Sequence, residues 1–212
     1  MSLYFDTGPA LKTEFRTGRA IKMADAIKSR YTSNPETVMY VAADIEDDGY
    51  TRAMIFEGLA DDHVQLPLVR PNDTVTIGAY SFIGNKICLR SLSILWRYEP
   101  LPLPERSNSP ESLKPTPVSA KGRIFRVGKV LSSDHQHPES TVHMAVELRR
   151  EEDGLVHTVV FKADVDNHPQ LVLGEEGNHV EIKYIPSSYT LGEVCLKDFE
   201  IDWDEVRRPF DT

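Results

Sequence analysis

The second half of this sequence repeats the first, and this duplication limits the possible folds more than any other feature. TGRAIKM at 17–23 aligns with KGRIFRV at 121–127, and ICLRSLSILW at 87–96 aligns with VCLKDFEIDW at 194–203. Both cysteines and both tryptophans of the chain therefore fall at equivalent positions. Because residues this rare do not recur in register by chance, we expect two domains of one fold.

The alignment also runs through the middle of each repeat. Val38 aligns with Val142, and DDHVQL at 61–66 aligns with DNHPQL at 166–171. The offset between the copies drifts only from 104 to 107 through short gaps. A single duplication event explains the whole pattern.

A proline-rich stretch separates the two copies. Residues 98–119 hold six of the fourteen prolines of the chain, and proline cannot donate to a central strand or sit inside a helix. We expect a partly stiff linker over 98–117. The expected domains are repeats over 14–97 and 118–204, followed by an acidic C-terminal tail over 205–212.

Each repeat is expected to be a small all-β domain, because its apolar residues alternate with period two. Three strands follow one another, a connection at 166–177 interrupts them, and two more strands complete the repeat. In the second copy, the expected strands are 122–131, 141–151, 156–165, 179–185 and 192–203.

This order of strands resembles tandem OB-fold proteins, including single-stranded DNA-binding proteins. The resemblance covers both repeats and implies two five-stranded, partly open Greek-key barrels. A small antiparallel sandwich, or one composite barrel built from both halves, would give the same pattern and stays an alternative.

Composition narrows the range of partners. Lys and Arg number 24 against 33 Asp and Glu, for a formal net charge of -9, and a net acidic protein repels phosphate at long range. It can still bind nucleic acid where basic residues share one face. Without a run of 18 apolar residues or a secretory leader, we expect an intracellular protein that does not enter a membrane.

The search for catalytic chemistry finds no constellation, so we expect no enzyme, no metal site and no cofactor. His63 and His168 recur without the companion ligands of a zinc site, and a turn before the fourth strand explains them. Cys88 and Cys195 lie between apolar neighbours and are expected in the barrel cores, reduced and separate. Trp96 and Trp203 are expected to close the barrels.

Binding residues are expected among the cations and aromatics, because single strands need both. The first strand of each repeat supplies Arg16, Arg19 and Lys22, then Lys121, Arg123 and Arg126. Lys121 and Arg123 are two apart and share a face of a strand, whereas the pairs three apart need a bulge to join them.

The loops of an OB-fold also grip its ligand. Between the fourth and fifth strands, the two repeats carry Tyr80, Phe82, Lys86, Tyr184 and Tyr189. The longer first loop of repeat 1 adds Lys28 and Arg30. The alternative is that these aromatics pack the barrel rims and the cations are solvated.

Two functions follow from these residues. One is the binding of single-stranded DNA or RNA by tandem OB-like barrels. The other is a non-catalytic adaptor whose barrels bind proteins, with the linker or the acidic C-terminus as further contact points. The net charge favours the adaptor, whereas the paired basic strands and aromatic loops favour nucleic acid.

Overall fold

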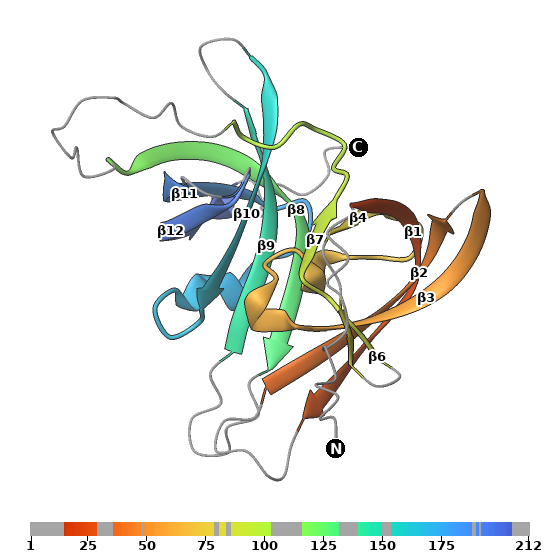
Figure 1. Ribbon diagram of the computed structural model, residues 1–212. Coiled ribbons are helices and arrows are strands. Elements are labelled where there is room, and N and C mark those ends of the chain that lie inside the picture. Colours follow the sequence, from red (N-terminus) through yellow and green to blue (C-terminus); the bar gives the residue numbers. More distant parts are fainter. Residues whose placement is uncertain are drawn as a thin grey trace, which may run out of the picture. The chain divides into compact units, whose positions relative to one another are not determined.

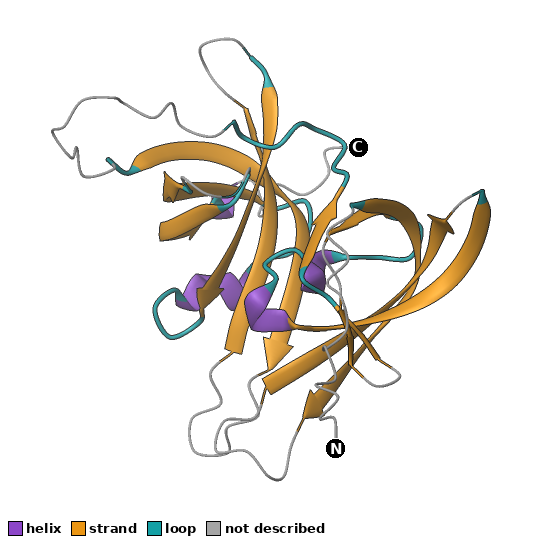
Figure 2. Cartoon of the chain, viewed as in Figure 1, coloured by secondary structure: helices purple, strands orange, loops and turns teal. Residues whose placement is uncertain are grey.

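The computed structural model describes the following residues: 15–28, 36–47, 49–78, 81–83, 86–102, 116–131, 140–149, 154–187, 190 and 192–204. The chain divides into two compact units, Met1–Leu95 and Trp96–Thr212. Both units are built from strands, with short 3-10 helices in the connections (Figures 1 and 2). The expected all-β fold class is confirmed.

The first unit is one sheet that closes on itself. Its strands are β1 Arg16–Lys28, β2 Glu36–Asp47, β3 Tyr50–Leu59, β4 Thr74–Gly78, β5 Ser81–Ile83, β6 Lys86–Cys88 and β7 Ser91–Ile94. Their order in the sheet is β5-β6-β3-β2-β1-β4-β7. The consecutive strands β6 and β7 form one interrupted fifth strand. Because β6 pairs with β3 and β7 pairs with β4, this strand joins the two sides of the sheet into a barrel.

The second unit repeats this arrangement. Its strands are β8 Val118–Leu131, β9 Ser140–Arg149, β10 Val156–Asp164, β11 His179–Pro186 and β12 Val194–Ile201, in the order β10-β9-β8-β11-β12. A parallel bridge between Val160 and Glu193 brings the start of β12 to β10. In both units, the first strand pairs with the second and the fourth, which is the topology of the OB-fold. The fold is two OB-like barrels.

Short 3-10 helices stand between the third and fourth strands, where the sequence predicts an irregular connection. They are η1 Ala60–Asp62 and η2 Leu66–Leu68 in the first unit and η3 Pro169–Leu173 in the second. The carbonyls of His63 and His168 accept bonds from the amides of Leu66 and Leu171, both at 3.0 Å. Both histidines therefore lie in equivalent turns.

The second strands of the two units, β2 and β9, are equivalent in a register that differs by one residue from the sequence alignment. Phe56 on β3 pairs with Val41, and its equivalent Phe161 on β10 pairs with Met144. Val41 thus corresponds to Met144, so that Met39, and not Val38, corresponds to Val142. The predicted alignment is wrong by one residue here. Such a slip exchanges the inner and outer faces of a strand, and only the pairing reveals it.

The rare residues that reveal the duplication do not have the expected environments. Cys195 is exposed and Cys88 is half-buried, although both are free as expected. Val194 and Leu196 point into the core, so the alternation of β12 turns Cys195 outward. Trp96 is 9% exposed and Trp203 is 37% exposed, and Trp203 is not a core residue. Residues at equivalent positions in the two copies therefore differ in burial.

The first residues of the expected linker are paired with the second barrel. Pro100 forms a parallel bridge with Thr158 on β10. The amide of Thr158 donates to the carbonyl of Glu99 at 3.0 Å, and the amide of Leu101 donates to the carbonyl of Thr158 at 3.2 Å. Residues 103–115 and the tail over 205–212 lie outside the described part of the chain.

Candidate nucleic-acid interface

A bulge in the first strand of the first barrel brings two cations to one face. The pairing of β1 with β2 shifts between Ala20 and Lys22, so that Arg19 lies opposite Asp44 and Lys22 lies opposite Ala42. Because Asp44 and Ala42 are two residues apart on β2, the side chains opposite them point to the same side. The sequence predicts that a bulge is needed here, and the pairing supplies it.

The second barrel carries the same bulge. The pairing of β8 with β9 shifts between Ile124 and Arg126, which places Arg123 opposite Glu147 and Arg126 opposite Ala145. Both barrels therefore present two cations from their first strand on the outer face. These outer faces are the natural places to look for a ligand in an OB-fold.

The outer face of the first barrel carries exposed apolar groups beside these cations. Lys22 on β1, Ala42 on β2 and Ile55 on β3 form one row across the sheet. The next row carries Tyr40 on β2 opposite Glu57 on β3. Lys22 is exposed, Tyr40 is half-buried and Ile55 is 63% exposed. Ile55 therefore leaves an apolar side chain open to solvent in the same row as Lys22.

The equivalent face of the second barrel is closed. Val160 occupies the position of Ile55, opposite Ala145, which in turn lies opposite Arg126. Val160 is 1% exposed and Ala145 is 0% exposed. The outer faces of the two barrels are therefore built from equivalent residues but differ in accessibility. The face of the first barrel is open, and that of the second is buried.

The two arginines of the second face are engaged within their own unit. Arg123 forms an ion pair at 3.2 Å with Glu147, a carboxylate that is 8% exposed. The guanidinium of Arg126 lies 5.3 Å from the ring centroids of both Trp96 and Phe125. Arg123 thus has a carboxylate that a phosphate would have to displace, and Arg126 is packed against two aromatic rings.

Of the two further cations of the first strands, one faces inward and the other joins the pair of the second barrel. Arg16 is half-buried and lies opposite Ile77, a core residue of β4, so it shares the inner face of β1 and is not grouped with Arg19. Lys121 lies opposite Glu181 on β11 and shares a face with Arg123, as predicted from their spacing. The three expected cations of β8 thus share one face, whereas Arg16 is separated from Arg19 and Lys22 on β1.

The prediction that Tyr184 stacks on bases is wrong. Its side chain is 5% exposed and belongs to the hydrophobic core of the second barrel. Val180, Ile182 and Tyr184 are two residues apart along β11, so the alternation that identifies this strand also turns the ring inward.

The remaining expected site residues are not described at side-chain level. Three lie outside the described residues, namely Arg30, Tyr80 and Tyr189. Three lie within strands whose side chains are not described there, namely Lys28 in β1, Phe82 in β5 and Lys86 in β6. Their roles stay predictions.

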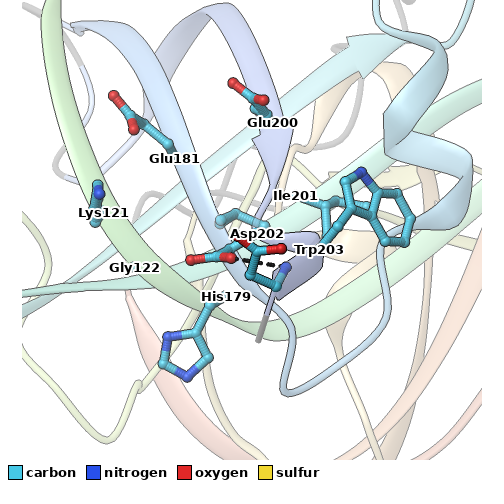
Figure 3. Close-up of a pocket in the computed structure, with 10 residues that line it drawn as sticks. Lys121, Gly122, His179, Glu181, Glu200, Ile201, Asp202 and Trp203 are labelled. Atoms are coloured by element: carbon cyan, nitrogen blue, oxygen red, sulfur yellow. Dashed lines mark hydrogen bonds between the residues drawn. The ribbon is translucent and has the colours of Figure 1, made fainter. Parts of the chain in front are cut away.

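A pocket of about 350 Å³ lies on the outer side of β8, β11 and β12 (Figure 3). Lys121, Glu181 and Glu200 form one row across these strands. The pocket is further lined by His179, Asp202, Trp203 and Asp204. Four carboxylates against one lysine repel phosphate, so this pocket does not fit a nucleic-acid backbone.

Three residues of the open face of the first barrel are not predicted from the sequence. They are Ile21, Tyr40 and Ile55. Ile21 is the extra residue of the bulge in β1 and is 45% exposed. The alternation of Val41, Ala43 and Ile45 inward would have placed Tyr40 outward. The sequence does not indicate that Ile55 is exposed, because an apolar residue in a strand is expected to lie in a core.

Within the described ranges, no group of three His, Cys, Asp or Glu side chains is placed to hold a metal ion. The same part of the chain contains no helix with the length and hydropathy for a membrane crossing.

No protein-family model matches the sequence, and no curated protein matches it. Among solved structures, the chain is similar to the wild-type single-stranded DNA binding protein from Thermus aquaticus, with 11% identity, a TM-score of 0.31, and coverage of 93% of this chain and 94% of that chain. A murine DNA binding protein bound with double-stranded DNA shows 13% identity and a TM-score of 0.28, with coverage of 89% and 98%.

The tetrameric p202 HIN2 shows 10% identity and a TM-score of 0.30, with coverage of 92% of this chain and 96% of that chain. These similarities extend over nearly the whole length of each protein. At such low identities and TM-scores, they add no argument about function.

Proposed function

We propose that this protein binds single-stranded nucleic acid on the outer face of β1, β2 and β3 in its first barrel. The observation that carries this proposal is the exposure of Ile55, at 63%, in one row with Lys22. Exposed apolar and aromatic side chains beside cations suit single-strand binding, because bases pack on such side chains and phosphates need positive charge.

The charges of this face suggest where the strand would run. Arg19 and Lys22 lie on β1, whereas Asp44 lies on β2 and Glu57 lies on β3. Phosphates are attracted to β1 and repelled from β2 and β3. The backbone of the strand would therefore follow β1, and its bases would lie over Tyr40 and Ile55.

The proposed role is binding without catalysis and without a cofactor. Arginine, lysine and tyrosine on this face supply phosphate and base contacts, which need no chemical step. The two free cysteines fit a reducing compartment, and we place the protein inside the cell.

A second candidate is a protein ligand on the same face. Ile21 and Ile55 are exposed at 45% and 63%, and Asp44 on β2 and Glu57 on β3 lie on the same face as Ile55. Exposed apolar residues with carboxylates fit a partner segment that carries apolar and basic side chains. This adaptor role would need no phosphate contact.

The experiment that tests the proposal is fluorescence anisotropy with labelled single-stranded DNA, single-stranded RNA and duplex DNA at two salt concentrations. Ile55→Asp should abolish binding, because it places a negative charge in the same row as Lys22. Leu173→Asp is the matched control, since Leu173 is 57% exposed in the second unit. If the intact protein binds no strand at low salt, the proposal falls and the adaptor role leads.

A further inference from the structure

Residues 96–101, here called the strap, lie against the outer face of the second barrel. At one end, the indole of Trp96 packs edge-on against Phe125, with ring centroids 6.1 Å apart and an interplanar angle of 75°. Phe125 is the extra residue of the bulge in β8. Trp96 is 9% exposed and therefore nearly fully buried.

Arg126 lies over both rings of this contact. Its guanidinium is 5.3 Å from the centroid of Trp96 and 5.3 Å from the centroid of Phe125. Arginine over an aromatic face is held by cation–π attraction. A nucleobase on an OB-fold is bound by a similar combination of an aromatic contact and a cation, so the surroundings of Trp96 resemble those of a bound base.

The other end of the strap is fixed to β10. The hydroxyl of Thr158 donates to the carbonyl of Tyr98 at 3.4 Å, and the backbone of Thr158 bonds to Glu99 and Leu101. The amide of Gly192 donates to the carbonyl of Leu101 at 3.1 Å. A Cβ atom at Gly192 would lie 2.7 Å from that of Pro100, so glycine is needed for this approach.

The two attachments of the strap lie on either side of β9. In the sheet, β9 lies between β8, which holds Phe125, and β10, which holds Thr158. Only Arg97 separates Trp96 from Tyr98, so the two attachments are close along the chain. The row of Arg126, Ala145 and Val160 joins the same three strands, and Ala145 and Val160 are buried.

We propose that the strap is a built-in competitor that covers a second single-strand-binding face. This inference rests on the proposed function of the first barrel. The two faces share their bulge and their cations, but the first is open and the second is occupied by the protein's own chain. A segment tethered to its site acts at an effective concentration of the order of millimolar. A strand must then displace Trp96 before it reaches Arg126.

The test compares oligonucleotide binding by Trp96→Ala with that by Trp203→Ala. The matched control removes the equivalent tryptophan of the second repeat, which is 37% exposed and lines the acidic pocket. Trp96→Ala should bind at least several-fold more tightly than the intact protein. Its logarithmic salt dependence should be steeper by about 0.7, because Arg126 gains a phosphate contact. Trp203→Ala should match the intact protein.

A second measurement covers the case in which Trp96→Ala does not fold. In Trp203→Phe, Trp96 is the only tryptophan left, and its displacement by an oligonucleotide should shift its emission to the red and increase quenching by iodide. Thr158→Val removes the hydroxyl bond to the strap with little change of shape, and should increase both responses.

The outcomes separate the two proposals. If folded Trp96→Ala binds no more tightly than the intact protein, or if Trp96 emission does not respond to a bound strand, the strap inference is overturned while the first face keeps its proposed role. If neither the intact protein nor Trp96→Ala binds any strand, the proposed function fails, and the strap has no ligand to exclude.

Discussion

The side-chain oxygen of Gln65 accepts a hydrogen bond at 2.9 Å from the backbone amide of Ile94, the last residue of β7. In the second unit, Gln170 and Ile201 form the same bond at 3.0 Å. Each glutamine ties the connection before the fourth strand to the end of the barrel. The duplication therefore repeats a tertiary interaction as well as a strand order.

Replacing Gln65 with Leu should destabilise the first unit by about 1–3 kcal/mol, because the buried amide of Ile94 loses its acceptor. Native-state hydrogen exchange followed by NMR should show loss of protection at Ile94. Gln170→Leu should act on the second unit with a smaller effect, since Gln65 is buried and Gln170 is half-buried. Unchanged exchange at Ile94 would contradict the role of Gln65.

Gly122→Ala should destabilise the second unit by about 1–3 kcal/mol. A Cβ atom at Gly122 would lie 2.4 Å from the carbonyl oxygen of Glu147, a backbone atom that cannot move aside alone. Urea unfolding monitored by circular dichroism measures the loss. Ser119→Ala, at an exposed site on the same strand, should leave the unfolding midpoint unchanged. Equal midpoints for the two variants would show that β8 does not approach β9 this closely.

The first unit should lose stability as the pH falls through the His63 transition. Burial lowers the pKa of His63 below its ordinary value of 6.5, although the charge of Asp62 and a hydrogen bond with the backbone of Leu89 oppose this shift. The unfolded chain thus binds the proton first as the pH falls below about 6.5, so stability decreases from there until the pH passes the folded pKa.

Thermal unfolding of the first unit between pH 5 and pH 8 measures this dependence. His63→Gln removes the titrating group and should flatten the profile near pH 6. His168→Gln provides the control at the equivalent turn of the second unit. A wild-type profile that already shows no slope in this range would rule out the effect.

The double variant Arg19→Ala with Lys22→Ala should weaken the dependence of nucleic-acid affinity on salt. Each phosphate contact to a single strand contributes about 0.7 to the logarithmic slope, so the loss of both cations should lower the slope by roughly twice that amount. The matched control is Lys183→Ala with Lys197→Ala, which removes two exposed cations from the second unit. If both double variants change the slope equally, the attraction is general and β1 is not the phosphate track.

The sequence by itself determined the duplication, the strand order and the all-β class. These depend on local alternation and on the recurrence of rare residues, both of which are present in the linear chain. It also determined that Arg19 and Lys22 can share a face only through a bulge, because a three-residue spacing does not match a period of two.

Only the tertiary structure decided which of these residues are accessible. Ile55 and Val160 are both apolar residues of a third strand, yet one is exposed and the other is buried. Cys88 and Cys195, and likewise Trp96 and Trp203, are equivalent in sequence and different in environment. Burial depends on what packs against an outer face, such as the strap beside Phe125, and those contacts join residues that are distant in the chain. Local periodicity carries no information about them.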